Sequence, residues 1–224
     1  MKKSSDQLCE ALGHFFTDTG LLSQALTHRS ANASNNERLE FLGDAILNFS
    51  LTYELYSRFP EATEGELSRM RASLVQGETV ASLAQDLNLG QHIELGLGER
   101  KSGGQRRNSI LADAMEAVFG AILLDSDAET CKNLIIRLYQ SRIDDLPSPE
   151  ELKDPKTRLQ EYLQARGLAL PKYNLIQTSG AGHAQQFVIE CRISLFDDAA
   201  VGEGSSRRKA EQDAAQKSLS RINS

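Results

Sequence analysis

The sequence predicts a multidomain chain of α and α+β class, with an all-helical domain first and a smaller α-β-β-β-α domain second. In the earlier part of the 224-residue chain, apolar residues recur with the helical period, and the alternation typical of a strand appears only later. A proline-containing segment separates the two patterns. We therefore place the helical domain at residues 1–146, a linker at 147–153 and the second domain at 154–224.

The first domain contains four stretches in which apolar side chains lie three and four residues apart and so share one face of a helix. These stretches cover residues 8–16, 38–58, 65–87 and 109–139. Helices with one apolar face bury that face against each other, so the pattern predicts several helices around a common core.

The segment LPSPEELKDPK, residues 146–156, contains Pro147, Pro149 and Pro155 among charged residues. Proline lacks a backbone N–H and restricts the chain, so prolines placed in this way break helices and stiffen a connection. We expect the domain boundary here.

The second domain is predicted to begin with a helix at residues 155–166. In FVIECRISL, residues 187–195, alternation predicts a strand with one buried face. The side chains on that face are Phe187, Ile189, Cys191, Ile193 and Leu195. Shorter strands are predicted in YNLIQTSG and AAVGEGSS, each bounded by glycine, and SSRRKAEQDAAQKSLSRI closes the chain as a helix.

The composition, with 40% hydrophobic residues and a net charge of -6, is that of an ordinary globular protein and excludes collagen-like and disordered chains. The longest apolar stretch, residues 110–124, is shorter than the roughly 20 residues that a bilayer requires, so no membrane partner is expected. The first residues lack the pattern of a signal peptide, which favours a cytoplasmic protein. Cys9, Cys131 and Cys191 are far apart and are expected to be buried free thiols.

Charge also divides the chain. Residues 154–224 contain ten Lys and Arg against eight Asp and Glu, which leaves fifteen against twenty-three for residues 1–153. A net-acidic body is a poor partner for a polyanion, so binding to one is expected from the second domain.

Two pairs of carboxylates lie in apolar helices of the first domain. Glu40 and Asp44 are four residues apart, and Asp113 and Glu116 are three apart, so each pair shares a helix face. For the first pair, an ordinary solvated face is an equally good interpretation. For the second pair it is a poor one, because an ionised carboxylate in an apolar surround needs a cation, a proton or a metal.

Four carboxylates with no His or Cys near them in sequence suit a hard cation such as Mg²⁺ or Mn²⁺ rather than Zn²⁺. A ferritin-like di-iron site requires Glu-x-x-His, which neither helix contains. An acidic Mg²⁺ site beside a basic domain favours phosphodiester chemistry on nucleic acid.

At these residues the chain resembles a known family. The stretch ERLEFLGDA, residues 37–45, resembles the signature of the ribonuclease III endonuclease domain, and the likeness continues through LSRMRASLV, GERKSGGQRRNSILADAMEAVFGA and the whole tail. The order of a nuclease domain followed by a double-stranded-RNA-binding domain is similar to that of the bacterial enzymes.

The resemblance implies a Mg²⁺-dependent endoribonuclease, with Mn²⁺ as a substitute, that leaves 5′-phosphate and 3′-hydroxyl ends with short 3′ overhangs. It implies ribosomal RNA precursors and some messenger and transfer RNA precursors as substrates. It also implies a homodimer in which Phe41 packs across the interface. The implied site residues are Glu40, Asp113 and Glu116 for the metal, Asp44 and Glu116 as most directly catalytic, and Glu37 and Glu64 in supporting roles.

The tail offers groups suited to double-stranded RNA. Ser205 or Ser206 can cap a helix whose first turn holds Arg207, Arg208 and Lys209. Three cations there interact unfavourably with the helix dipole, which costs stability unless an anion such as phosphate binds. A solvated basic helix start remains an alternative. On the first helix of the tail, one face presents Thr157, Gln160 and Glu161 to ribose hydroxyls, and the resemblance adds His183 in a turn between strands.

Some interpretations stay open. The segment ERKSGGQRRNS, residues 99–109, is basic and is either a contact for RNA phosphates or a solvated loop. No phosphate-binding or dinucleotide-binding motif is present, so no nucleotide cofactor is expected. Two rival functions are a non-catalytic RNA-binding or ribosome-associated protein and a metal-dependent hydrolase of small nucleotides.

Overall fold

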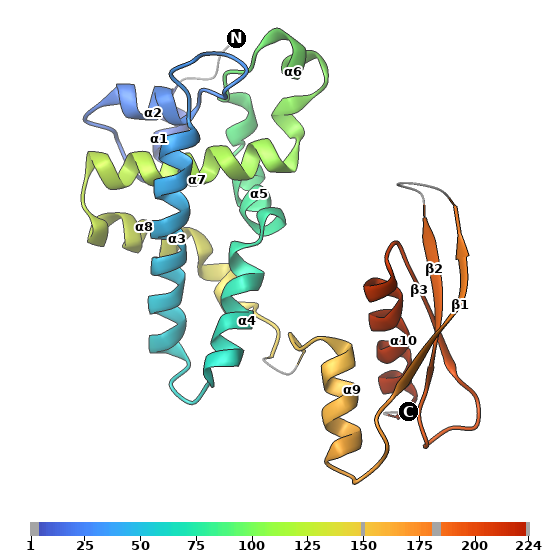
Figure 1. Ribbon diagram of the computed structural model, residues 1–224. Helices are drawn as coiled ribbons and strands as arrows, with labels where there is room; N and C mark the ends of the chain where they lie inside the picture. Colours follow the sequence, from blue (N-terminus) through green and yellow to red (C-terminus); the bar gives the residue numbers. More distant parts are fainter. Residues whose placement is uncertain (1–4, 149–150, 181–184, 223–224) are drawn as a thin grey trace. The chain divides into compact units, whose positions relative to one another are not determined.

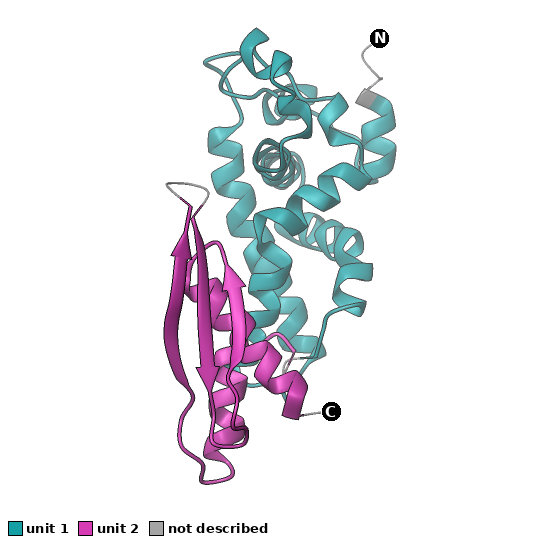
Figure 2. Cartoon of the chain, turned by 90° about the vertical axis from the view of Figure 1, so that its right-hand side faces the viewer, with its two compact units in different colours: residues 1–149 teal, residues 150–224 magenta. Residues whose placement is uncertain are grey.

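The computed structural model describes residues 5–148, 151–180 and 185–222 (Figure 1). The chain divides into two compact units, residues 1–149 and residues 150–224 (Figure 2). The first unit is helical and the second combines helices with a sheet, as the sequence predicts. No helix in the described ranges is long and apolar enough to cross a membrane.

The first unit is built mainly from α-helices, with two short 3₁₀ turns. Its elements are α1 (Ser5–Leu12), α2 (Thr19–Ala25), α3 (Glu37–Arg58), α4 (Glu64–Val75), α5 (Gly77–Asp86), η1 (Leu89–Gln91), α6 (Leu97–Lys101), η2 (Gly104–Arg106), α7 (Asn108–Asp125) and α8 (Ala128–Asp144). Helix α7 is buried on almost every side, and α3 crosses it (Figure 1). The core of this unit therefore lies around α7.

Three of the predicted helical stretches end or break earlier than their periodicity indicates. Helix α1 stops at Leu12, because Gly13 takes a φ of +69° and the N–H of His14 returns to the carbonyl of Cys9. The stretch at residues 65–87 is two helices, α4 and α5, separated where Gln76 is extended. The stretch at residues 109–139 is also two, because the Asp127 side chain accepts the N–H of Thr130 and starts α8.

The second unit has the order α9 (Pro155–Gln164), β1 (Lys172–Ser179), β2 (Gln186–Arg192), β3 (Ala200–Gly204) and α10 (Arg207–Ile222). The strands form an antiparallel sheet in the order β1-β2-β3. Helix α10 packs on β2 and β3, and α9 packs beside α10. The main cluster of buried residues consists of Leu159, Leu163, Cys191, Ile193, Ala214, Ala215 and Leu219.

One detail of this unit differs from the sequence interpretation. The predicted strand at residues 187–195 ends at Arg192, and Leu195 is 41% exposed instead of facing the core. The reason is a turn in which the N–H of Phe196 approaches the carbonyl of Ile193.

Pro155 occupies the first turn of α9, where its missing N–H is not needed, and the Asp154 side chain caps that helix. The three cysteines are buried free thiols, as predicted.

Candidate active site and nucleic-acid interface

The four carboxylates of the apolar helices lie on either side of the crossing between α3 and α7. Glu40 and Asp44 lie on α3 and flank Gly43, whose backbone is pressed against the carbonyl of Glu116 on α7. Glu116 interacts electrostatically with Asp44, Glu40 and Asp113. The two pairs, more than sixty residues apart in sequence, therefore form one acidic cluster.

Glu116 has the most strongly shifted pKa in this cluster. Burial raises its pKa to about 7, and repulsion from the three other carboxylates acts in the same direction. Burial also raises the pKa of Glu40, with repulsion from Asp113 and Glu37 adding to it. The pKa of Asp113 is raised by burial, although the charges of His28 and Arg29 oppose the shift. The cluster holds more negative charge than its surroundings neutralise.

Part of the cluster opens into a polar pocket of about 490 Å³. Glu37, Glu40 and Asp113 line this pocket, together with basic residues from two loops. Arg29 lies 3.4 Å from Glu37, and Arg107 lies 3.0 Å from Glu99. The pocket is therefore lined by both carboxylates and guanidinium groups, a combination that suits a phosphate accompanied by a cation.

The donor set fits a hard divalent cation by charge and by chemistry. Within the ranges that the structure describes, Glu40, Asp44, Asp113 and Glu116 form no ion pair with Lys, Arg or His within 4 Å. Asp44 accepts a hydrogen bond of 2.8 Å from the side chain of Asn48. In those same ranges no three His, Cys, Asp or Glu side chains are already arranged to hold a metal. Mg²⁺ keeps several waters and needs few direct carboxylate ligands, so the four carboxylates need not be pre-arranged around it.

The two acids expected in supporting roles lie in different places. Glu37 lines the acidic pocket and accepts a hydrogen bond from Asn35. Glu64, at the start of α4, accepts a hydrogen bond of 2.7 Å from Ser68 and lines a separate pocket with Thr52. Thr52 is twelve residues beyond Glu40 on α3, roughly 18 Å along the helix. Glu64 lines a pocket other than the one that Glu37, Glu40 and Asp113 line.

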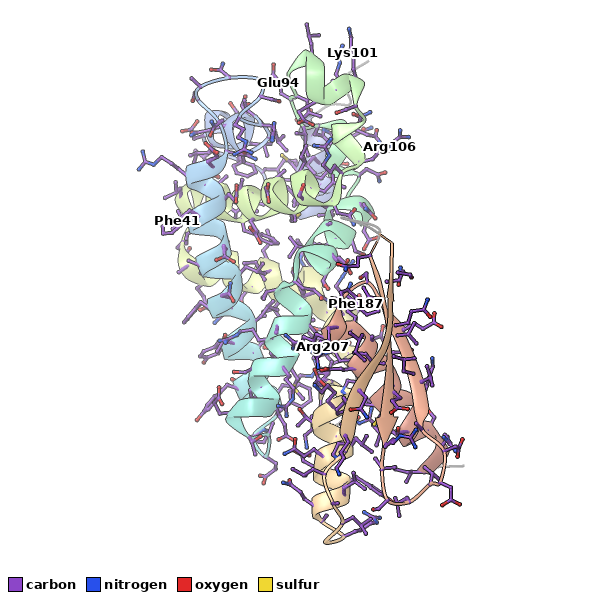
Figure 3. The ribbon with its side chains drawn as sticks, turned by 45° about the vertical axis from the view of Figure 1, so that its right-hand side comes forward. Phe41, Glu94, Lys101, Arg106, Phe187 and Arg207 are labelled. Atoms are coloured by element: carbon purple, nitrogen blue, oxygen red, sulfur yellow. The ribbon has the colours of Figure 1, made fainter. Side chains whose placement is uncertain are left out.

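Phe41 is 82% exposed on α3 and extends outward from that helix (Figure 3). It borders a hollow of about 640 Å³ that Leu21, Leu42 and Leu124 also line. A large aromatic side chain in water beside an apolar hollow is unusual for a monomeric surface and is typical of an interface.

His28, Arg29 and Arg107 are pocket residues that the sequence interpretation did not assign. The first two precede α3 in an irregular segment, where no periodic pattern marks them. Arg107 belongs to the basic segment 99–109, whose Lys101 and Arg106 lie on the surface (Figure 3). The structure thus directs one basic residue of that segment, Arg107, to the acidic pocket, where Glu99 and Ser109 of the same segment also lie.

In the second unit, the residues expected to contact RNA lie at two places on the surface. Ser206 caps α10 by accepting the N–H of Lys209 at 3.2 Å, whereas Ser205 is exposed and precedes the cap. The side chains of Arg207, Arg208 and Lys209 are all exposed. Thr157, Gln160 and Glu161 are exposed on α9, on the side away from buried Leu159 and Leu163. His183 lies outside the described residues.

Comparisons with known proteins agree with this geometry. A family model described as Ribonuclease-III-like matches residues 18–143, and one described as Double-stranded RNA binding motif matches residues 155–222. The chain is 55% identical to Ribonuclease 3 of Nitrosococcus oceani, covering 98% of this chain and 95% of that protein. It is 53% identical to Ribonuclease 3 of Shewanella amazonensis, covering 99% and 98%. Among solved structures, the chain is similar to the nuclease domain of ribonuclease III from Campylobacter jejuni, with a TM-score of 0.61 and 42% identity. The match covers 62% of this chain and 97% of that one, and the structure concerns flexibility in a region involved in dimer formation.

Proposed function

The chain belongs to the ribonuclease III family and is an endoribonuclease with a double-stranded-RNA-binding domain, and from this we propose that it hydrolyses double-stranded RNA in a Mg²⁺-dependent reaction at the acidic cluster. The observation that carries the proposal is the position of the Glu116 carboxylate, which is partly desolvated and repelled by three other carboxylates. Carboxylates crowded in this way are costly to the fold unless a cation joins them. A divalent cation is the partner that also serves phosphodiester hydrolysis.

In the proposed reaction, the oxygen of a water molecule bonds to phosphorus, the bond from phosphorus to the 3′ oxygen breaks, and that oxygen takes up a proton. The products carry 5′-phosphate and 3′-hydroxyl ends. When bound, Mg²⁺ or its substitute Mn²⁺ supplies an activated water and neutralises the phosphoryl oxygens. Glu40, Asp113 and Glu116 would hold the cation, and Asp44 and Glu116 most directly serve the reaction. Glu116 is half-buried on α7, which limits its contact with bulk water and strengthens its electrostatic effect.

The second unit is proposed to hold the duplex through two regions. Double-stranded RNA presents 2′-hydroxyls across its shallow minor groove and phosphates beside it. The exposed face of α9 offers hydrogen-bonding side chains for the sugars, and the first turn of α10 offers cations for the phosphates. We include His183 in the proposal on the family resemblance alone.

We also propose that two copies assemble, with Phe41 packing across the interface. The exposure of Phe41 and the apolar hollow beside it support this assembly. Two sites would then each cut one strand and leave short 3′ overhangs. The proposed substrates are ribosomal RNA precursors and some messenger and transfer RNA precursors, which places the protein with them in the cytoplasm.

The test is incubation of the full chain with a long RNA duplex, with and without Mg²⁺, beside single-stranded RNA and duplex DNA, followed by mapping of the ends. We expect Mg²⁺-dependent cuts in duplex RNA alone, with 5′-phosphates. Glu78→Gln, on the exposed start of α5, serves as a matched control for Glu116→Gln. Tight duplex binding without cleavage in Mg²⁺ or Mn²⁺ would instead indicate a non-catalytic RNA-binding protein, and hydrolysis of small nucleotides alone would indicate a nucleotide hydrolase.

A further inference from the structure

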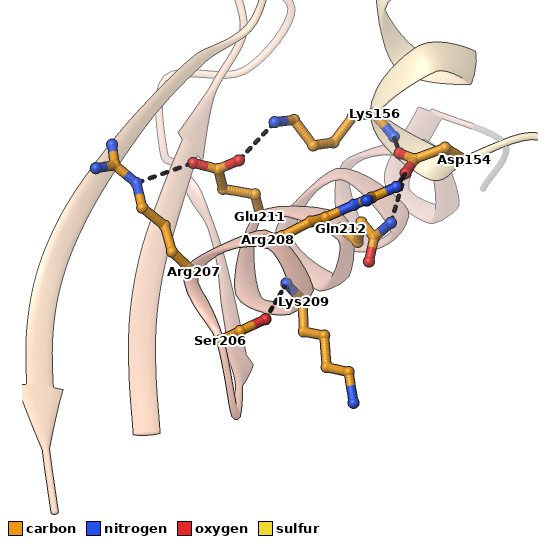
Figure 4. Close-up of polar contacts among 8 residues, drawn as sticks. All are labelled: Asp154, Lys156, Ser206, Arg207, Arg208, Lys209, Glu211 and Gln212. Carbon is orange, nitrogen blue, oxygen red and sulfur yellow. Dashed lines mark hydrogen bonds and ion pairs between the residues drawn. The ribbon is translucent and has the colours of Figure 1, made fainter. Parts of the chain in front are cut away.

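The three cations at the start of α10 are not equally available. The guanidinium of Arg207 donates to Glu211 at 3.2 Å, and Arg208 lies 3.7 Å from Asp154 (Figure 4). Lys209 donates its backbone N–H to Ser206, and its ammonium forms no ion pair within the described part of the chain. A phosphate that approaches this turn therefore meets one cation without a counterion and two that already have one.

Glu211 is the acid that holds cations from two different helices. One of its oxygens accepts from Lys156 of α9 at 2.5 Å, and the other accepts from Arg207 of α10 (Figure 4). Its side chain is only 14% exposed, whereas that of Arg207 is 63% exposed. Burial by itself raises the pKa of Glu211, but the hydrogen bonds and charges of Lys156 and Arg207 outweigh it and keep that pKa below the usual range. Glu211 is therefore a fixed negative charge beneath a surface that is proposed to bind phosphate.

Lys156 and Arg207 can still bind a phosphate, but Glu211 lowers the net positive charge that they present to it. Arg207 donates only its Nε–H to Glu211, and a guanidinium carries five N–H donors, so the others remain for a phosphate. The ammonium of Lys156 also lies 4.8 Å from the ring centre of Tyr173, which keeps it near the protein surface. A phosphate that binds both cations must share them with a carboxylate that cannot diffuse away.

We propose that Glu211 is an internal counterion that weakens the hold of Lys156 and Arg207 on the RNA backbone and so sets the affinity and salt dependence of duplex binding. This inference rests on the proposed function. The group of Lys156, Arg207 and Glu211 has one net positive charge, and neutralising Glu211 gives it two. A carboxylate that merely stabilised the fold would, when replaced, weaken binding or leave it unchanged.

The test compares Glu211→Gln with wild type in the full chain, using fluorescence anisotropy of a labelled RNA duplex without divalent cations, so that nothing is cut. We expect Glu211→Gln to bind roughly two- to fivefold more tightly near 0.1 M salt, the range that exposed ion pairs produce. The plot of log affinity against log salt should steepen by about one counterion. Asp198→Asn is the matched control, because it removes one negative charge whose partner, Arg221, is at the other end of α10. This control should leave affinity and slope unchanged.

A second comparison does not depend on the folding of Glu211→Gln. Because Arg207 already has a counterion and Lys209 has none, Arg207→Gln should weaken binding less than Lys209→Gln does. Where Glu211→Gln folds, the tighter binding that it causes should also shrink in the Arg207→Gln background. Thermal unfolding of each variant verifies that the second unit is intact.

Unchanged or weaker binding by folded Glu211→Gln would overturn the inference, as would an equal loss from Arg207→Gln and Lys209→Gln. These results would leave the proposed function in place, because wild type would still bind the duplex. If wild type bound no duplex RNA, the proposed function would fail and the inference with it.

Discussion

Gly43 of α3 and Gly120 of α7 lie against each other's backbone where the two helices cross. A Cβ on Gly43 would lie 1.7 Å from the carbonyl oxygen of Glu116 and 3.0 Å from the backbone nitrogen of Gly120. A Cβ on Gly120 would lie 2.2 Å from the carbonyl oxygen of Leu39 and 3.1 Å from the nitrogen of Gly43. This close approach brings Glu116 within electrostatic reach of the α3 carboxylates.

Gly43→Ala should therefore push α3 away from α7. The clash is with backbone, which no side-chain rotation relieves, so we expect a loss of about 1–3 kcal/mol and a thermal midpoint lower by roughly 3–10 °C. RNA cleavage should fall with it. Gly77→Ala is the matched control, since a Cβ there meets nothing within 4 Å. Equal unfolding midpoints and activities for the two variants would contradict the role given to this crossing.

Glu116→Gln should abolish cleavage while leaving duplex binding almost unchanged. The substitution keeps the size of the side chain but removes the charge proposed to hold Mg²⁺, and the proposed duplex contacts belong to the second unit. We expect the single-turnover rate to fall by roughly a hundredfold or more, with the Kd for duplex RNA within about twofold of wild type. A parallel loss of binding would count against the assigned role.

The same substitution should change stability in a pH-dependent way when no divalent cation is present. The pKa of Glu116 is raised from 4.5 to about 7 in the folded chain, so the folded state binds the proton more tightly than the unfolded state does. The destabilisation is absent below about pH 4.5, grows as the pH rises, and is complete above about pH 7. Glu116→Gln should thus exceed wild type in stability by more at pH 8 than at pH 5, by on the order of 1–2 kcal/mol.

Urea unfolding of metal-free wild type and variant at the two pH values measures this difference directly. Titrating groups outside the acidic cluster are shared by the two proteins and cancel. Adding Mg²⁺ at pH 8 should stabilise wild type and not Glu116→Gln. A stability difference that did not depend on pH would show that the Glu116 carboxylate is not desolvated in the way its surroundings indicate.

Phe41→Glu should convert the proposed homodimer into monomers. A charged side chain in place of an aromatic one cannot pack into an apolar interface without a large desolvation penalty. Sedimentation at micromolar concentration should report half the mass of wild type. Leu97→Glu is a suitable control, because Leu97 is 73% exposed on α6 and has no proposed interface role. A dimer that persisted in Phe41→Glu would remove Phe41 from the interface.

Lys209→Ala should weaken binding to RNA duplexes of different sequence by the same factor. A phosphate contact carries no sequence information, and its loss should reduce the slope of log affinity against log salt by about one. Lys217→Ala is the control on the same helix, since Lys217 is paired with Asp213 at 2.8 Å. If the salt slope of Lys209→Ala equalled that of wild type, Lys209 would not contact phosphate.

Features that depend on near neighbours along the chain could be predicted from the amino-acid sequence alone. Four-residue and three-residue spacings place Glu40 with Asp44, and Asp113 with Glu116, on shared helix faces. Alternation placed Ile189 and Cys191 on the buried face of a strand. Periodicity did not reveal the break at Gln76, because apolar side chains continue at helical spacing on both sides of it.

Which distant residues meet depends on how the helices and strands pack in three dimensions. The tertiary structure packed Gly43 against Glu116, directed Arg107 to the acidic pocket and left Glu64 away from it. It also distinguished Arg207, which Glu211 holds, from Lys209, which has no ion pair among the described residues. Electrostatic and steric interactions depend on separation in space, and local spacing along a chain does not report how two helices cross or which charge lies beneath another.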